Sequence, residues 1–292
     1  MTASVALATA SAYPDLAADG PLLLDALTRH GVKAEPAVWT DPQVRWASYD
    51  LVVIRSTWDY FHRRDDFLAW IDTVAAVTRL ANPAGVLRWN TDKTYLRDLS
   101  AAGVPVVPTT WLVPGDAFTA PASGDYVVKP AVSAGSRDTA HYRGGVHDNV
   151  AAAHVARLLE AGRTVMVQPY LDGVDSYGET AQLFFAGRFS HAIRKGPMLA
   201  AAGEEPGQEL IEPRVPTASE RSVAEAVLDA MPWPRTALTY ARVDVVPGGD
   251  GMPRLMELEV TEPSMFLVHD AGAADRFAVA IADRLTATAP LH

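Results

Sequence analysis

The sequence predicts an α/β protein in which an N-terminal domain with a parallel sheet precedes lobes of α+β character. Residues 1–80 alternate short apolar runs with segments of helical periodicity, the order of βαβ units with parallel strands. From Tyr126 onward, strand-like runs dominate the sequence, with helical segments between them. The 292 residues suffice for about two domains, or for one large α/β unit with lobes.

The first 80 residues contain three strand candidates and two helix candidates. Leu51–Ile54 is a continuous apolar run, typical of a strand that is covered on both faces. Phe67–Val77 places its apolar side chains at helical spacing. The other candidates are strands at Val5–Ala8 and Ala34–Trp39, and a helix at Pro21–Leu27 that stops at Gly31.

Turn-forming and capping residues divide the rest of the chain. Asn82-Pro83 ends the first pattern, and Thr91-Asp92 offers N-cap chemistry for a helix that ends at Gly103. Leu112–Gly124 is rich in Pro, Gly and Ser and is predicted to connect two lobes. Later strands are predicted at Tyr126–Lys129, Val165–Pro169, Ala181–Phe185, Phe189–Ile193, Leu238–Val246 and Arg254–Val260, and helices near 149–161, 217–230 and 273–286.

Composition excludes several classes of protein. Asp and Glu outnumber Lys and Arg by 35 to 25, and the net charge of −10 argues against a nucleic-acid binder that depends on phosphate contacts. The chain has no cysteine, which excludes disulfides, thiolate nucleophiles and cysteine metal sites. No Lys or Arg precedes the first apolar run, and no run reaches the roughly 18 residues that span a bilayer. Neither a signal peptide nor a membrane segment is expected, and the protein is predicted to be cytoplasmic.

The strongest chemical pattern is a pair of late strands joined by the turn-forming run 247–251. If the strands pair antiparallel, Asp244 lies opposite Glu257, and the same register places Arg242 opposite Glu259. Alternation then puts all four side chains on one face. The opposite face receives apolar side chains: Val243, Val245, Met256 and Leu258.

Three carboxylates this close repel each other unless they are protonated or neutralised by cations. Oxygen ligands without His or Cys suit magnesium, which binds a few carboxylates together with phosphate oxygens. Asp244, Glu257 and Glu259 are therefore candidate metal ligands. The alternative is a solvated hairpin face with a structural Arg–Glu pair.

Basic and small residues upstream suit a bound phosphate. A strand ends in Lys129 and runs into a loop of small residues, 130–136, whose N–H groups can approach an anion. The loop lacks the spacing of a P-loop. Lys93 begins a predicted helix, whose N-terminus attracts anions, and Arg194 and Lys195 follow a strand. Each feature alone is also compatible with a structural role.

Two further segments open from the ends of strands. The run 164–173 is an apolar strand that opens into a turn, where exposed main chain can hydrogen-bond an adenine edge; a buried strand with a surface turn is the alternative. A polar and aromatic cluster lies at the carboxyl end of the third strand, where ligands collect in open α/β sheets. Its members are Arg55, Ser56, Thr57, Trp58, Asp59 and Tyr60. Asp59 beside aromatic faces suits a cationic α-amino group, and packing and capping are the alternative role of the cluster.

Taken in order, these segments resemble the ATP-grasp superfamily over almost the whole chain. The resemblance implies an N-terminal α/β substrate domain (1–90), a central ATP-binding lobe (91–170) and a C-terminal lobe with the metal site (171–292), the two lobes closing over ATP. It implies that two magnesium ions are bound by Asp244, Glu257 and Glu259, and that the transferred phosphoryl group is bound by the catalytic cations Arg242, Arg194 and Lys195. The residues that it implies for ATP binding are Lys93, Lys129, Ser133, Gly135, Ser136, Gln168, Tyr170, Leu171 and Glu179. The chain departs from the superfamily in having only Gly135 in its loop and Glu259 where an asparagine is common.

Within the superfamily, the runs 55–60, 190–195 and 257–264 look closest to the cycloserine synthetase family. That resemblance implies an ATP-dependent ligase that activates a small amino-acid-like carboxylate as an acyl phosphate. A nitrogen of the same molecule then closes the ring, which converts O-ureido-D-serine to D-cycloserine. A ligase that joins the carboxylate to a separate amine and a non-catalytic ATP-binding regulator are the alternatives. The oligomeric state is left open, with a homodimer as one option.

Overall fold

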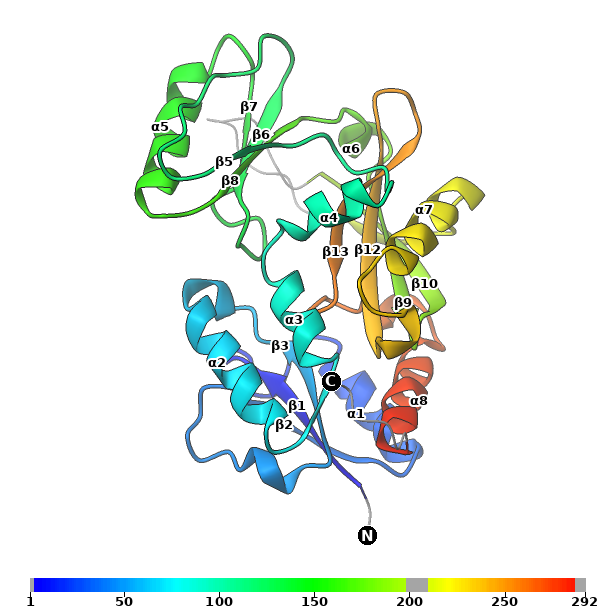
Figure 1. The fold of residues 1–292 in the computed structure, drawn as a ribbon. Helices are drawn as coiled ribbons and strands as arrows, with labels where there is room; N and C mark the ends of the chain where they lie inside the picture. Colours follow the sequence, from blue (N-terminus) through cyan, green and yellow to red (C-terminus); the bar gives the residue numbers. More distant parts are fainter. Residues whose placement is uncertain (1–2, 198–209, 287–292) are drawn as a thin grey trace.

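The computed structural model describes residues 3–197 and 210–286, which form three sheets and the helices that cover them. One four-stranded sheet is parallel, and the other four-stranded sheet and the five-stranded sheet are antiparallel. In Figure 1 the parallel sheet lies at the bottom, the antiparallel four-stranded sheet at the top and the five-stranded sheet to the right. The predicted α/β architecture with α+β lobes is confirmed.

The N-terminal sheet has the strand order β2-β1-β3-β4, all parallel. Its elements are β1 (Ser4–Thr9), α1 (Gly20–Arg29), β2 (Lys33–Val38), β3 (Leu51–Ser56), α2 (Arg64–Ala75) and β4 (Arg79–Ala81). The apolar run of β3 is buried along its whole length, because α2 covers one face and α1 the other. All three predicted strands and both predicted helices of this region are confirmed, whereas the short β4 was not predicted.

Two short helices link the parallel sheet to the rest of the chain: α3 (Ala84–Asn90) and α4 (Tyr95–Ala101). The predicted helix that ends before Gly103 is confirmed as α4, but its predicted cap at Thr91-Asp92 is wrong because the helix begins at Tyr95, and α3 was not predicted. The Thr91 hydroxyl donates back to the Arg88 carbonyl at the end of α3, and the Asp92 carboxylate accepts from the Thr94 N–H. These local bonds turn the chain between the two helices, so Lys93 lies in the turn and does not begin a helix.

The central sheet has the strand order β5-β8-β6-β7 and packs its inner face on α5. The elements are β5 (Thr110–Leu112), β6 (Tyr126–Pro130), β7 (Ala140–Tyr142), α5 (Asp148–Glu160) and β8 (Val165–Pro169). Leu112–Gly124 joins β5 to β6 within this one sheet, so its prediction as a connection between lobes is wrong. Its composition marks a loop but carries no information about which elements the loop joins.

The five-stranded sheet has the order β11-β10-β9-β12-β13. Its elements, with α6–α8, are α6 (Gly173–Ser176), β9 (Glu179–Phe185), β10 (Arg188–Lys195), β11 (Ile211–Pro213), α7 (Ala218–Asp229), β12 (Tyr240–Pro247), β13 (Pro253–Glu259) and α8 (Ala273–Thr286). The predicted register of the last two strands is confirmed: Asp244 pairs with Glu257 and Arg242 with Glu259. The pairing shifts after Asp244 and leaves Met256 without a partner residue, which is the bulge that perturbs strict alternation there.

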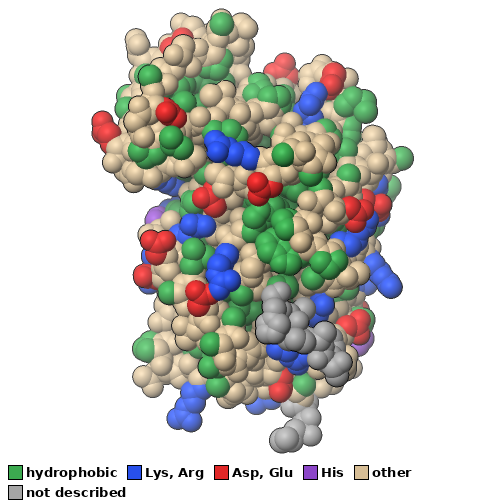
Figure 2. All heavy atoms as spheres, in the orientation of Figure 1, with side chains coloured by type: hydrophobic (Ala, Val, Ile, Leu, Met, Phe, Trp, Pro, Cys, Tyr) green, Lys and Arg blue, Asp and Glu red, His purple; other side chains and the backbone are tan. Residues whose placement is uncertain are grey.

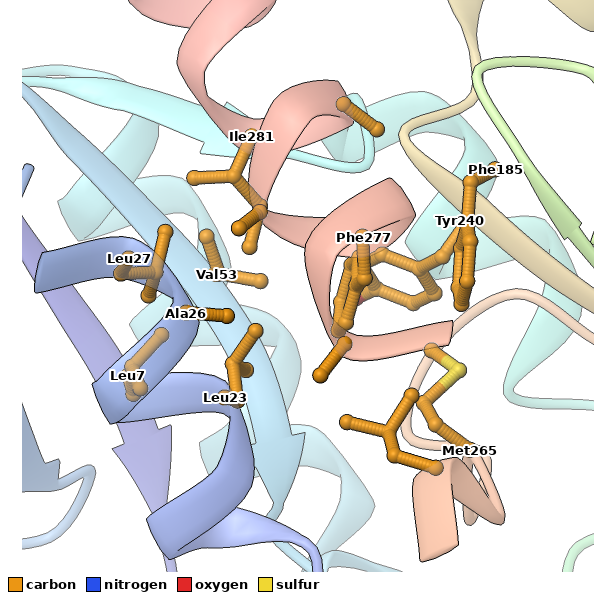
Figure 3. Close-up of a cluster of buried hydrophobic side chains, with 14 of the residues drawn as sticks. Leu7, Leu23, Ala26, Leu27, Val53, Phe185, Tyr240, Met265, Phe277 and Ile281 are labelled. Atoms are coloured by element: carbon orange, nitrogen blue, oxygen red, sulfur yellow. The ribbon is translucent and has the colours of Figure 1, made fainter. Parts of the chain in front are cut away.

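The C-terminal helix α8 returns to the N-terminal domain and lies beside α1 (Figure 1). In the core between them, the Phe277 ring of α8 stacks on Phe185 of β9 with 4.7 Å between centroids, and Tyr240 of β12 meets it edge-on (Figure 3). Leu23 and Val53 of the parallel sheet region belong to the same cluster. One hydrophobic core therefore joins the N-terminal domain to the five-stranded sheet.

Candidate active site

A cavity of about 590 Å³ lies where the three sheets meet, a volume typical of a small-molecule site. The N-terminal domain contributes Trp58, the central sheet Lys129 and the five-stranded sheet Glu257. The predicted site residues that line it are Trp58, Asp59, Tyr60, Lys93, Lys129, Ser133, Gly135, Ser136, Gln168, Tyr170, Leu171, Glu179, Lys195, Arg242, Glu257 and Glu259. Five predicted residues do not line it: Arg55, Ser56, Thr57, Arg194 and Asp244.

Arg242 and its carboxylate neighbours form the buried floor of the cavity. The Arg242 guanidinium donates to Asp244 at 2.9 Å and to Glu259 at 2.7 Å. Burial alone would lower the pKa of Arg242, but the two carboxylates raise it overall. The arginine therefore remains charged and is held in one orientation by bonds to two acidic partners.

Asp244 lies behind this floor and is 1% exposed. One of its oxygens accepts from Arg242, and the other accepts from Lys195 at 2.7 Å and from Arg242 at 3.0 Å. Burial would raise the pKa of Asp244, yet the two cations lower it overall. Both oxygens accept from protein cations, so in this geometry Asp244 positions Arg242 and Lys195, and its role as a metal ligand stays a prediction.

Two lysines face Glu257 from different parts of the chain. Lys93 lies 3.0 Å from the Glu257 carboxylate and also donates to the Ser133 carbonyl at 2.8 Å, which ties the small-residue loop to the α3–α4 turn. Lys129 is 9% exposed, and its burial lowers its pKa although Glu257 opposes the shift. Within the described residues Lys129 forms no ion pair inside 4.0 Å, so its ammonium is available to an anion in the cavity.

The neighbours Arg194 and Lys195 point to opposite faces of β10. Lys195 pairs with Glu179 at 2.7 Å on the cavity face. Arg194 lies opposite Thr180, on the face that packs against α7, and donates to the Tyr177 carbonyl at 2.6 Å. The predicted phosphoryl-binding role of Arg194 is therefore wrong in this geometry, because alternation along the strand turns its side chain away from the cavity.

The predicted adenine segment lies at the end of β8. The Gln168 amide group donates to the Thr109 hydroxyl of the neighbouring strand region, and the Tyr170 ring stacks on His141 with 3.9 Å between centroids. Val127 and Met256 also line the cavity, giving this end apolar walls. Met256 was predicted on the opposite face of its strand, and the bulge beside Asp244 accounts for the difference.

The N-terminal cluster divides between the cavity and the core. Arg55, Ser56 and Thr57 are buried at the end of β3, and the Arg55 guanidinium donates to the Pro263 carbonyl and lies over the Phe277 ring. Arg55 is turned toward α8, and the Ser56 hydroxyl accepts from the Ala17 N–H. The predicted contact of these three residues with substrate is wrong in this geometry, because none of them lines the cavity. Trp58, Asp59 and Tyr60 follow the strand and line the cavity.

Comparison with known proteins places this geometry in a family. The model for the N-terminal domain of the D-cycloserine synthetase DcsG matches residues 5–82. The cycloserine biosynthesis protein DcsG of Streptomyces lavendulae is 41% identical over 284 residues, covering 91% of this chain and 94% of that protein. The chain belongs to the DcsG family. The crystal structure of the D-cycloserine synthetase DcsG superposes with a TM-score of 0.89 at 39% identity, over 97% of this chain and 100% of that one.

More distant structures share the fold of the DcsG family. They include D-alanine–D-alanine ligase from Bacillus anthracis with ATP, at a TM-score of 0.65 and 14% identity over 97% of both chains. The ATP-grasp ligase PsnB with a minimal precursor, magnesium and ADP has a TM-score of 0.62 at 18% identity over 98% of both chains. The chain thus has the fold of these ATP-grasp ligases. Its membership of the D-cycloserine synthetase family confirms the predicted enzyme class, an ATP-dependent ligase. A non-catalytic regulator is not supported.

The acidic face of this DcsG-family chain fits magnesium only in part. Within residues 3–197 and 210–286, no three His, Cys, Asp or Glu side chains converge to hold a metal by themselves. The Glu257 and Glu259 side chains are 25% and 23% exposed. Burial, with Glu257 adding to it and Arg242 opposing, raises the pKa of Glu259 to about 7. Two glutamates with incompletely neutralised charge suit a magnesium ion that takes its remaining ligands from phosphate and water.

Several cavity residues of the DcsG-family site were not predicted from the sequence. Tyr13, Asn90, Glu262 and Phe266 all line the cavity. Glu262 belongs to the run 257–264 that carries the resemblance, so its position could have been noticed. The others lie in loops or at a helix end, where no periodicity marks them.

On the face in Figure 2, Lys and Arg side chains are interspersed with Asp and Glu side chains. Over the described part of the chain, no helix combines the length and apolar character of a membrane span.

Proposed function

We propose that this chain closes the ring of O-ureido-D-serine to D-cycloserine at the expense of ATP. The observation that carries the proposal is the composition of one cavity, which combines five Lys and Arg side chains with the partly exposed Glu257 and Glu259 and an aromatic wall. The likeness to the D-cycloserine synthetase DcsG supports the choice of substrate. The cavity volume of about 590 Å³ suits a nucleotide together with a small amino acid.

In the first step, a carboxylate oxygen of the substrate attacks the γ-phosphorus of ATP. The new O–P bond gives an acyl phosphate, and the bond to the β-phosphate oxygen breaks to release ADP. Lys129, Lys195 and Arg242 stabilise the charge on the transferred group. Carboxylates hold Lys195 and Arg242 in place before the substrate arrives, and Lys129 is a buried cation without an ion pair among the described residues. We assign Lys93 to the same function, through its place between the small-residue loop and Glu257.

In the second step, the nitrogen bonded to the side-chain oxygen attacks the acyl carbon. The C–N bond forms, the bond from carbon to the phosphate oxygen breaks, phosphate leaves with the electron pair and the nitrogen loses its proton. Water then hydrolyses the carbamoyl group from the ring nitrogen, which takes up a proton, and the group leaves as carbon dioxide and ammonia to give D-cycloserine. The nucleophile is tethered to the acyl group, so a small enclosed site favours ring closure over the joining of two molecules.

Glu257 and Glu259 are the residues that would hold magnesium, and we propose two ions, as in the predicted site. Magnesium supplies positive charge that neutralises the phosphates and orients them for in-line transfer. We assign Ser133, Gly135 and Ser136 to the phosphates through their main chain. Gln168, Tyr170, Leu171 and Glu179 are assigned to the adenine and ribose.

We further propose that residues 1–90 bind the amino acid, 91–170 the nucleotide and 171–292 the metal. As an ATP-consuming biosynthetic enzyme it would act in the cytoplasm. Light scattering on purified protein decides whether it is a monomer or a homodimer.

The test is a product screen by mass spectrometry with ATP, magnesium and O-ureido-D-serine beside common amino acids. Release of ADP together with the mass of cycloserine is the expected result. A dipeptide formed from two amino acids, with no product from O-ureido-D-serine, would replace the proposal with an intermolecular ligase.

A further inference from the structure

The carboxylates that line the cavity differ in whether a cation neutralises them. Four of them form ion pairs within 3.0 Å: Asp59 with Arg63, Glu179 with Lys195, Glu257 with Lys93 and Glu259 with Arg242. Glu262 is the exception, with no cation inside 4.0 Å among the described residues. It is 7% exposed and lines the cavity, so it is a buried acidic group that faces the space where substrate binds.

The main chain around Glu262 is fixed by bonds from distant parts of the protein. The Trp58 indole N–H donates to the Glu262 carbonyl at 2.8 Å. The hydroxyl of Tyr240 donates to the Thr261 carbonyl at 2.9 Å, and Arg55 donates to the Pro263 carbonyl at 3.3 Å. These bonds hold Glu262 in place before any ligand binds, which lowers the entropy cost of recognition.

The surroundings of Glu262 suit a cationic group. Tyr13 and Trp58 meet edge to face with 5.0 Å between centroids, and both line the cavity near the segment that carries Glu262. Aromatic faces attract cations, most strongly when the cation is desolvated. Burial and the charge of Glu259 raise the pKa of Glu262 to about 8, against a hydrogen bond from Tyr60 that lowers it, so Glu262 keeps its proton at neutral pH in the ligand-free protein. A cationic group bound beside it favours the ionised carboxylate.

Asp59, the predicted partner of a substrate amine, is already occupied. Its two carboxylate oxygens accept from the Trp39 indole at 2.8 Å and from Arg63 at 3.0 Å. A carboxylate neutralised by an arginine has little attraction left for an ammonium group. The structure therefore favours Glu262 over Asp59.

We propose that Glu262, with Tyr13 and Trp58, binds the α-ammonium group of the amino-acid substrate. The inference rests on the proposed function and names a residue that decides specificity within it. Ion pairing to Glu262 keeps the amine protonated, and a protonated amine is not a nucleophile. The subsite thus keeps the α-amine of one substrate from attacking the acyl phosphate of another, and leaves the tethered nitrogen as the only competent nucleophile.

The test measures binding, so that it does not depend on turnover. Calorimetry with magnesium and a non-hydrolysable ATP analogue compares O-ureido-D-serine with the analogue in which hydrogen replaces the α-amino group. The wild-type protein is expected to prefer the amine by about 10- to 100-fold, the scale of a hydrogen-bonded charge pair. Glu262→Gln, which keeps the shape of the side chain, should abolish that preference.

Glu225→Gln is the matched control, because Glu225 pairs with Arg221 on the exposed side of α7, away from the cavity. It should retain the wild-type preference. The inference is overturned if the wild-type protein does not prefer the amine, or if Glu262→Gln weakens both ligands equally. Affinity for the ATP analogue reports whether the variant is folded. If Glu262→Gln does not bind the ATP analogue, Glu262→Asp, whose side chain is shorter, is used instead. An undiminished preference of Glu262→Asp for the amine over the deaminated analogue also overturns the inference.

Failure of the proposed function would be seen separately, in the product screen. If the wild-type enzyme joins two amino acids, the same comparison is made with its actual substrate and the matching deaminated acid. Loss of the preference in Glu262→Gln would then support the ammonium subsite although the ring closure had failed.

Discussion

Replacing Asp244 by asparagine separates the metal role predicted from the sequence from the positioning role seen in the structure. If Asp244 is a metal ligand, its carboxylate repels the neighbouring carboxylates in the ligand-free protein. Asp244→Asn would then leave the free energy of unfolding unchanged or increase it. As the acceptor for Arg242 and Lys195, it compensates two buried cations, and its neutralisation would destabilise the fold.

The structure sets the size of the effect. Asp244 is 1% exposed and accepts hydrogen bonds from Arg242 and Lys195 at 2.7–3.0 Å. Removing one partner of a buried ion pair costs about 3–5 kcal/mol. Asparagine keeps one carbonyl acceptor, and Glu179 and Glu259 still neutralise part of the charge, so we expect the lower end, about 3 kcal/mol. For a chain of this size that corresponds to a melting temperature lower by roughly 6–12 °C.

The assay is thermal unfolding of the ligand-free protein at neutral pH, without magnesium. Asp275→Asn is the control, since Asp275 pairs with Arg29 in an exposed bridge between α8 and α1 and its loss should hardly move the transition. An Asp244→Asn variant that melts with the wild type but no longer responds to magnesium would refute the positioning role and restore Asp244 as a ligand.

Three further predictions address the rest of the cavity. Glu257→Gln should lower magnesium-dependent turnover on the order of 10²-fold, measured as initial rates over a magnesium titration; a wild-type response would remove Glu257 from the metal site. Lys129→Ala should weaken ATP binding by about 1.5–3 kcal/mol in calorimetry, and unchanged affinity would mean that the lysine does not contact the nucleotide. The free energy of unfolding of the ligand-free protein should fall as the pH rises from about 5 to about 8. Glu262 has a pKa of about 8 in the folded protein and keeps its proton over this range, whereas the unfolded chain releases that proton near pH 4.3. Urea unfolding at pH 5.5 and pH 8 should show a smaller change in the free energy of unfolding for Glu262→Gln than for the wild type. An equal change in the two proteins would show that Glu262 is not the cause.

The hairpin that carries Asp244 and Glu257 could be predicted because the information is local. Strand alternation fixes which side chains share a face, and the short turn-forming run between the strands limits the register. The same reasoning located Lys129, the penultimate residue of β6, and Trp58, two residues beyond the end of β3. Strand ends and short hairpins are features that a single sequence specifies well.

Features that depend on distant partners could not be predicted. Nothing local distinguishes Arg194 from Lys195, and only the packing of α7 on one face of β10 and the cavity on the other decides between them. Glu262 lies in a loop without periodicity, fixed by a bond from Trp58, 204 positions earlier in the chain. The bulge that exposes Met256 to the cavity likewise has no signature in its own residues.

The arrangement of the cores explains how one cavity can serve two ligands. Tyr240 and Phe277 join the N-terminal domain to the five-stranded sheet, so the end of the cavity with Trp58 and Glu262 is built on a single core (Figure 3). Lys129 belongs to the central sheet, whose buried cluster with α5 is separate. A substitution at the amino-acid end therefore acts through a different set of packed residues from a substitution at the nucleotide end. The changes in the free energy of unfolding that the two substitutions cause should be additive.

The residues that link the two ends of the cavity are Lys93 and Glu257. Their ion pair spans the boundary, and Lys93 also contacts the small-residue loop through the Ser133 carbonyl. Coupling between ATP and amino-acid binding should depend on that ion pair, because it is in contact with both halves of the site.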